Sequence, residues 1–189
     1  FSDIFEENYL PSMPYHGGFG MMNLYGVPKP IYRAMQMLRA LGDEQIKVSG
    51  QHDNVAVWIG RHDGDNPRTD VVLINQALPE HPVGNESVRL RVTHPATISA
   101  KGIMRSRVDE DHGNPKRAWC EMGSPEYPSH DQVNALQAAS EAVQQPMPFV
   151  VSDGLLEIDL VLAPQSVNHL QIDWDRPLGQ SAQRPLTAV

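Results

Sequence analysis

The sequence predicts a mainly β protein that begins with a short strand, a bend and a helix. After residue 42, most of the chain consists of short runs in which apolar and polar side chains alternate, as they do on half-buried strands. Clusters rich in proline, glycine and asparagine separate these runs and indicate turns. Several short alternating strands with such turns are typical of an antiparallel β-sandwich or barrel.

Seven strands are expected from this alternation. In residues 87–93, for example, valine and leucine side chains share one face, while Arg89 and Arg91 share the other. Residues 62–67 are expected to form a polar hairpin turn, and residues 176–189, which show no period, are expected to form a tail. The expected strands are residues 46–49, 55–60, 69–75, 87–93, 101–108, 155–162 and 167–174.

Two helices are expected, over residues 28–42 and 131–143. Apolar residues recur at helical spacing in the first, and Gly42 is a natural terminator for it. Ser129 or Asp131 is expected to cap the second helix. The apolar stripe of the first helix is expected to pack into a core and comprises Ile31, Ala34, Met35, Leu38 and Leu41. Core or inter-domain positions are also expected for Trp58, Trp119 and Trp174.

The change of pattern at Gly42 divides the chain into three segments. Residues 1–42 follow the strand–bend–helix pattern, residues 43–175 the sandwich pattern, and residues 176–189 form the expected tail. The first segment is too small to bury its own apolar face. We therefore expect it to be one piece of a larger domain that is truncated in this chain.

Composition restricts the class of function. The hydrophobic fraction of 40% and the charged fraction of 20% are those of a globular protein. No apolar run reaches the length of a membrane span, and we expect a soluble protein of the cytoplasm or periplasm. A net charge of −8 argues against nucleic-acid binding, which depends on Lys and Arg. The one cysteine, Cys120, excludes an internal disulfide and is expected to be a buried structural thiol.

Most catalytic and metal-binding patterns are missing from the sequence. The glycine bend that follows His16 lacks the third glycine of a dinucleotide fingerprint and the Gly-Lys-Ser/Thr of a phosphate loop. No His-Glu-x-x-His, Cys-x-x-Cys or Gly-x-Ser-x-Gly pattern occurs, so no zinc site, cofactor or catalytic residue is assigned. For residues 109–115, DEDHGNP, a bound cation stays open as an alternative to a polar turn.

Glu6 and Glu7 directly follow the first strand-like run, and their position allows two interpretations. Acids after a strand are commonly solvated. A strand followed by a loop and a helix is, however, also the βα unit of a barrel, in which the carboxyl ends of the strands carry the active site. Carboxylates at that place bind sugar hydroxyls or perform acid–base chemistry.

Two motifs resemble glycoside hydrolase family 39, the family of β-xylosidases and α-L-iduronidases. FSDIFEE followed by PYHGGFGMMNLYGVPKPIYRAMQMLRALG resembles the last strand, bend and helix of its catalytic barrel. VDEDHGNPKRAWCEMGSPEYPS, residues 108–129, resembles a stretch of the bacterial β-xylosidase branch. The resemblance extends to about Trp174.

The resemblance implies a (β/α)8 TIM barrel followed by a β-sandwich, of which this chain would hold the last βα unit and the sandwich. Family members are retaining glycosidases, which need two carboxylates about 5–5.5 Å apart. By resemblance both lie on earlier barrel strands, so this chain holds neither. The resemblance places Glu6, Glu7, His16 and Phe19 at the rim of the sugar pocket.

The function that the resemblance implies is that of the C-terminal portion of a β-xylosidase. The intact parent would release xylose from xylo-oligosaccharides, as in xylan degradation, and the isolated chain would be inactive. Its partners would be xylosides, the missing N-terminal barrel portion and, through the tail, other copies of the chain. Two alternatives are a stand-alone carbohydrate-binding or interaction β-sandwich and one piece of a nicked enzyme.

Overall fold

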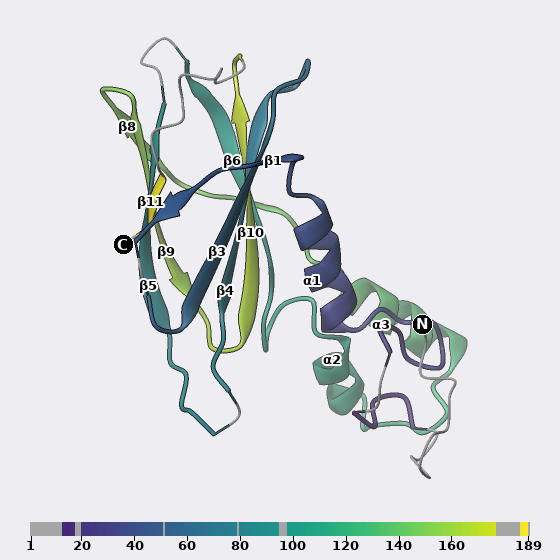
Figure 1. The fold of residues 1–189 in the computed structure, drawn as a ribbon. Helices are drawn as coiled ribbons and strands as arrows, with labels where there is room; N and C mark the ends of the chain where they lie inside the picture. Colours follow the sequence, from purple (N-terminus) through teal and green to yellow (C-terminus); the bar gives the residue numbers. More distant parts are fainter. Residues whose placement is uncertain are drawn as a thin grey trace. The chain divides into compact units, whose positions relative to one another are not determined.

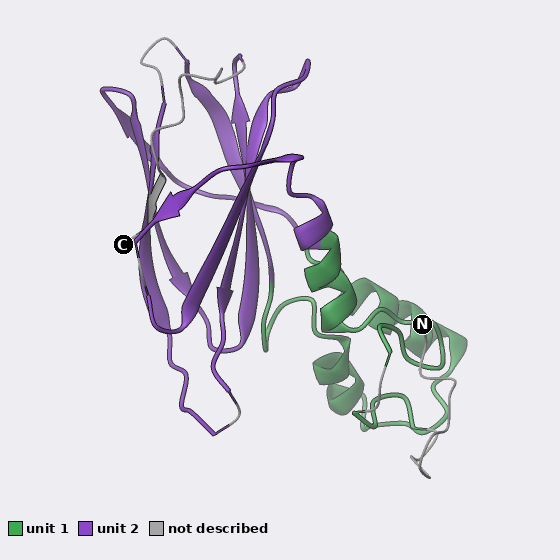
Figure 2. Ribbon diagram, in the orientation of Figure 1, with its two compact units in different colours: residues 1–36, 108–143 green, residues 37–107, 144–189 purple. Residues whose placement is uncertain are grey.

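The computed structural model describes residues 13–17, 20–50, 52–78, 80–94, 98–176 and 186–188, to which the structural statements below refer. The chain forms two compact units, each assembled from two separate stretches of sequence (Figure 2). The first unit comprises residues 1–36 and 108–143, and the second comprises residues 37–107 and 144–189. Within the described residues, no helix is both long enough and apolar enough to cross a membrane.

The second unit consists of two β-sheets (Figure 1). In spatial order, the six-stranded sheet contains β1 (Glu44–Gln45), β3 (Val55–His62), β4 (Arg68–Asn75), β10 (Ser166–Trp174), β6 (Ala100–Val108) and β7 (Gln145–Pro146). The five-stranded sheet contains β2 (Val48–Ser49), β11 (Leu186–Ala188), β5 (Glu86–Thr93), β9 (Leu155–Leu162) and β8 (Val150–Ser152). β3–β4, β4–β10 and β5–β9 pair antiparallel, whereas β11 pairs parallel with β2 and antiparallel with β5. The predicted mainly β, antiparallel class is therefore confirmed.

The predicted alternation sets the faces of these strands. β5 and β9 pair so that Leu90 lies opposite Ile158, and both side chains are fully buried. On the other face Arg89 lies opposite Asp159. Leu73 and Leu170 of the six-stranded sheet belong to the same hydrophobic core as Leu90, so the two sheets share one core. Burial of each such leucine contributes roughly 1.5–3 kcal/mol.

The strand predictions agree with the structure except at the shortest elements. Only the second half of the run expected at residues 46–49 is a strand, β2, which pairs with β11. β1 lies just before that run and pairs with β3 in the other sheet. β7, β8 and β11 were not predicted, since two or three residues show no period. β11 lies within the segment that was expected to be a tail. The predicted turn at residues 62–67 connects β3 to β4.

α1 (Pro30–Arg39) lies within the predicted range, but its buried face differs from the prediction. Ala34 and Met37 are buried, whereas Ile31 is 50% and Met35 46% exposed. The predicted stripe is therefore wrong for these two residues, because nothing among the described residues covers that side of the helix. Two residues separate the end of α1 from Gly42, which also shows that this glycine does not cap the helix.

Gly42 has a different role, which is to let two backbone segments approach closely. A Cβ built at Gly42 would collide with the backbone carbonyl of Arg61, and one built at Gly60 would lie 2.5 Å from the Gly42 nitrogen. Real Cβ atoms are essentially never so close to another atom. The segment after α1 thus crosses β3 at a place where neither chain has room for a side chain.

In the first unit, residues 108–143 add two helices, α2 (Pro115–Glu121) and α3 (His130–Ala139). α3 was predicted, and Ser129 is its N-cap in a reciprocal capping box with Gln132. α2 was not predicted, because seven residues with one buried aromatic show no period. The core of this unit comprises Tyr15, Val27, Trp119 and Leu136.

The tryptophan expectations were partly right. Trp119 and Trp174 are buried, whereas Trp58 is 38% exposed. The expected division at residues 42 and 175 concerns domains of a longer protein and stays a prediction. The compact units follow contacts instead, and they assign residues 108–143, which lie between β6 and β7 in the chain, to the unit that contains the N-terminal bend.

Candidate functional site

The structure describes one of the four residues predicted to bind sugar. Glu6, Glu7 and Phe19 lie outside the described residues. His16 is half buried and is followed by Gly17, whose φ of +82° belongs to the left-handed region that glycine adopts without strain. No atom lies within 4 Å of a Cβ built at Gly17, so the requirement there concerns backbone conformation and not space.

Tyr15 anchors the bend from the residue before His16. It is only 8% exposed, and its ring lies against that of Trp119, with centroids 5.6 Å apart and planes tilted by 54°. The buried Tyr15 hydroxyl makes no hydrogen bond of ordinary geometry. Burial raises the pKa of this hydroxyl well above its usual range, and the nearby Asn23 side chain offsets only part of that rise.

Asn23 organises the second half of the bend. Its Oδ1 accepts hydrogen bonds of 3.0 Å from the backbone N–H groups of Tyr25 and Val27, as in an Asx turn. The turn is closed by Gly26, whose φ is +72° and whose N–H donates to the Asn23 carbonyl. The Asn23 side chain is fully buried, and its Nδ2 makes no hydrogen bond of ordinary geometry with the described residues. The bend that precedes α1 is therefore ordered by its own backbone contacts.

Hydrogen bonds with residues 108–143 complete this arrangement. The Tyr25 hydroxyl donates to the Glu126 carbonyl at 3.3 Å, and Gln137 Nε2 donates to the Gly26 carbonyl at 3.1 Å. Arg33 of α1 donates from Nε to the Ser140 carbonyl and from Nη2 to the Ser140 hydroxyl, each at 2.9 Å. The two segments of the first unit are thus connected by backbone and side-chain hydrogen bonds as well as by the aromatic contact.

Two carboxylates of the acidic loop at residues 109–114 have partners in the loop or in α2. Asp109 Oδ1 accepts from the Asp111 N–H at 2.9 Å and lies 2.7 Å from His112 Nδ1, while Asp111 pairs with Arg117. A carboxylate only accepts, so the proton of His112 lies on Nδ1. Across the described part of the chain, no three His, Cys, Asp or Glu side chains are grouped as a metal would require.

Cys120 contradicts the expectation of a buried thiol, because it is exposed. Its neighbour Trp119 faces the core of the first unit. Consecutive residues of a helix point about 100° apart, so a single buried aromatic on α2 leaves the next side chain in solvent.

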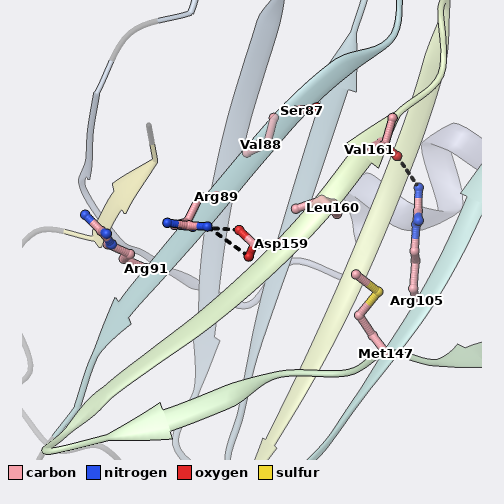
Figure 3. Close-up of a pocket in the computed structure, with 9 residues that line it drawn as sticks. All are labelled: Ser87, Val88, Arg89, Arg91, Arg105, Met147, Asp159, Leu160 and Val161. Carbon is pink, nitrogen blue, oxygen red and sulfur yellow. Dashed lines mark hydrogen bonds and ion pairs between the residues drawn. The ribbon is translucent and has the colours of Figure 1, made fainter.

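A second candidate is a surface hollow of about 680 Å³ in the second unit (Figure 3). Two of its three arginines pair with acids on the neighbouring strand. Arg89 donates two hydrogen bonds to Asp159, at 2.7 and 3.1 Å, and Arg91 donates to Glu157 at 2.8 Å. Among the described residues, none that lines the hollow is an aromatic side chain on which a sugar ring could stack; the lining residues are Ser87, Val88, Arg89, Arg91, Arg105, Met147, Asp159, Leu160 and Val161. The hollow therefore lacks the surface expected of a stand-alone sugar-binding module.

Comparison with known proteins decides the family. The family model described as glycosyl hydrolases family 39 matches residues 1–156. This chain belongs to glycosyl hydrolase family 39. The resemblance drawn from the two sequence motifs is thereby confirmed.

Two curated relatives of this family 39 chain are named β-xylosidases. The protein from Caldicellulosiruptor saccharolyticus is 36% identical over 174 residues, which cover 88% of this chain and 34% of that protein. The protein from Geobacillus stearothermophilus is 33% identical over 176 residues, which cover 93% of this chain and 33% of that protein. The chain thus spans about a third of the length of these relatives.

Solved structures agree with the family 39 assignment. A family 39 β-xylosidase from Caulobacter crescentus is 28% identical, with a TM-score of 0.64, over 91% of this chain and 34% of that one. The fold is also that of a family 39 enzyme from Xanthomonas axonopodis pv. citri, which is 24% identical, with a TM-score of 0.69, over 92% of this chain and 36% of that one.

Sequence reasoning missed the contact between Trp119 and Tyr15, the residue before His16, in this family 39 chain. Tyr15 and Trp119 are far apart in the sequence, and no local pattern connects them. The signal that was available for Asn23 is the run Asn23-Leu-Tyr-Gly26, which is typical of a turn closed by glycine.

Proposed function

We propose that this chain is the C-terminal portion of a retaining β-xylosidase that releases xylose from short xylo-oligosaccharides. The observation that carries the proposal is the identity of 36% and 33% to two proteins named β-xylosidase, over most of this chain but a third of theirs. The catalytic nucleophile and the acid/base are assigned to the part of the parent protein outside this chain.

The proposed architecture is the last βα unit of a TIM barrel followed by a β-sandwich. The shared core of the two sheets supports the sandwich. The exposed Ile31 and Met35 support the barrel unit, because they lie four residues apart and form an apolar stripe on α1. A helix of a barrel's outer ring would bury such a stripe against the neighbouring strands and helices.

The proposal assigns sugar binding to Glu6, Glu7, His16 and Phe19, of which the structure describes His16. An imidazole can donate one hydrogen bond and accept another, so it suits a sugar hydroxyl, which does both. Tyr15 and Gly17, on either side of His16, restrict its backbone. A side chain that is already in place loses less entropy when substrate binds.

The retaining mechanism requires a carboxylate nucleophile and a carboxylic acid about 5–5.5 Å apart. Our proposal places both on earlier strands, and it limits this chain to binding and orienting the sugar. The isolated chain is therefore expected to be inactive. Association between copies through residues 176–189 also belongs to the proposal, and the mass of the assembly in solution tests it.

The experiment compares substrates in the longer protein that contains this chain. We expect hydrolysis of an aryl β-xyloside with retention of the anomeric configuration, and much slower hydrolysis of an aryl α-L-iduronide. His16→Ala should raise KM for the xyloside, and His130→Ala, a substitution of an exposed histidine at the start of α3, serves as the matched control. Inversion, or a preference for the iduronide, would contradict the proposal.

A titration separates this proposal from the alternative of a stand-alone binding module. The isolated chain is titrated with xylotriose by calorimetry. The proposal expects no measurable affinity, because the pocket is incomplete. A dissociation constant in the micromolar to low millimolar range would instead favour the binding module.

A further inference from the structure

Residues 108–143 lie between β6 and β7 in the sequence, yet their contacts assign them to the unit that contains the bend (Figure 2). An insertion that only connected two strands would have no need of contacts with the N-terminal bend. Here the ring of Trp119 packs against that of Tyr15. Gln137 donates a hydrogen bond to the Gly26 carbonyl, and the Glu126 carbonyl accepts one from the Tyr25 hydroxyl. The ring of Trp119 thus lies against the residue before His16, and the other two contacts are to the turn at residues 23–27.

We propose that Trp119 of α2 is a positioning residue for His16. The inference rests on the proposed function only for the role of His16 in binding sugar. In this proposal the indole ring of Trp119 packs against Tyr15 and keeps it in place. Tyr15 in turn restricts the backbone of His16, the next residue in the chain. Trp119 itself does not touch substrate.

The Trp119 ring is held on two sides. It is 6% exposed, and its Nε1–H donates to the Pro125 carbonyl at 2.9 Å. Pro125 reaches this place because the chain reverses through Gly123 and Ser124, whose φ angles are +88° and +54°. The Ser124 N–H closes the turn by donating to the Trp119 carbonyl at 3.0 Å. The indole is thus fixed before it meets Tyr15.

Tyr15 depends on the indole more than most buried tyrosines do. A buried tyrosine hydroxyl usually has a hydrogen-bond partner, which helps to orient the ring. Among the described residues the Tyr15 hydroxyl has no partner of ordinary hydrogen-bond geometry, although the nearby Asn23 side chain interacts with it. Packing therefore contributes most to the orientation of this side chain. The aromatic contact with Trp119 is the directional part of that packing. On the other side of His16, Gly17 has a left-handed backbone conformation. We expect this backbone to become less ordered when Trp119, which packs against Tyr15, is replaced by a residue without an aromatic ring.

Leu136 provides a matched control within the same core. It lies on α3, is fully buried and belongs to the same cluster as Tyr15 and Trp119. Leu136→Ala removes buried volume from this cluster but leaves both rings. A general loss of stability would therefore appear in both variants, whereas a loss of positioning would appear only when the indole is removed.

The test measures the backbone order of His16 and Gly17 by ¹⁵N relaxation in the 189-residue chain, since order parameters are not altered by ring currents. We expect order parameters of about 0.85 for these two residues in the wild type and below about 0.6 in Trp119→Leu. In Trp119→Phe and Leu136→Ala the order parameters should equal those of the wild type. If Trp119→Leu does not fold, Trp119→Met, which is flexible and has no ring, takes its place.

The proposal is overturned if His16 and Gly17 keep wild-type order without an aromatic side chain at position 119. It is equally overturned if Leu136→Ala lowers their order as much as Trp119→Leu does. In the longer protein, Trp119→Leu should raise KM more than it lowers kcat, because ground-state and transition-state binding weaken together. The relaxation result needs no enzymatic activity, so failure of the positioning proposal and failure of the proposed function can be told apart.

Discussion

The carboxylate of Asp70 accepts a hydrogen bond of 2.7 Å from Nε2 of His169, and both side chains are buried on the adjacent strands β4 and β10. The other oxygen of Asp70 accepts from Arg68 Nε at 2.9 Å and lies 3.0 Å from His62 Nε2. The same His62 nitrogen lies 3.1 Å from the carbonyl of Ala40, just after α1. One buried acid thus connects three partners that extend to the end of the helix.

Asp70→Asn should destabilise the chain by about 2–3 kcal/mol. Removing one partner of a fully buried ion pair costs about 3–5 kcal/mol, and we expect less here because Arg68 is a third exposed. Urea denaturation measures the change. Asp159→Asn, which alters an exposed pair, is the control and should change stability far less. Equal effects of the two substitutions would show that the buried network contributes no more to stability than the exposed pair does.

Gly42→Ala should lower stability by about 1–3 kcal/mol, because the new methyl group has no space beside the backbone of Arg61. Gly102→Ala is the matched control, since no atom lies within 4 Å of a Cβ at that position. Thermal melts of both variants check the prediction. An unchanged melting temperature for Gly42→Ala would mean that the backbone crossing relaxes at little cost.

Strand β5, Gly42 and helix α1 show which parts of the fold could be predicted from the sequence and which could not. The alternation in residues 87–93 predicted which side chains of β5 face the core, because period two is a local property of a strand. Gly42 was interpreted as a helix terminator, because its contact with Arg61 depends on how a distant strand folds back. Ile31 and Met35 followed the helical period and were still exposed, since a period gives a shared face but not what covers it.

At the candidate site, too, the local motif could be predicted from the sequence, whereas the contact between distant residues could not. The motif around His16 predicted a bend and, through its resemblance, the family. Trp119, whose ring packs against Tyr15, belongs to a helix of seven residues, which is too short to show a period. The two rings come into contact only in the folded unit.

Tyr15→Phe should be neutral or should raise stability by up to about 1 kcal/mol at neutral pH, because it removes a buried hydroxyl that has no hydrogen bond of ordinary geometry. The folded-state pKa of Tyr15 is raised, so the stability tied to its neutral form is complete below pH 10. It is lost as pH rises from there through the folded-state pKa. Alkaline unfolding followed by circular dichroism should begin at higher pH in Tyr15→Phe. Identical alkaline transitions would contradict the pKa shift.

The pair formed by Arg89 and Asp159 should show the opposite pH dependence. The hydrogen bonds from Arg89 lower the pKa of the Asp159 carboxyl below its usual value. Their contribution is therefore present above the unfolded-state pKa and is lost as pH falls through the folded-state pKa, and it is small because both groups are exposed. Carbon-detected NMR titration of Asp159 should give a lowered pKa that returns to the ordinary value in Arg89→Ala. A pKa unaffected by Arg89→Ala would contradict this cause.

The most direct measurement of the central claim is the rate of aryl β-xyloside hydrolysis by the purified 189-residue chain, compared with that of the longer protein at equal molar concentration. If the nucleophile and the acid/base lie outside this chain, the chain alone shows no hydrolysis above the buffer rate, while the longer protein turns over. Hydrolysis by the isolated chain that survives repeated purification would contradict the account, because it would place a complete catalytic pair within these 189 residues.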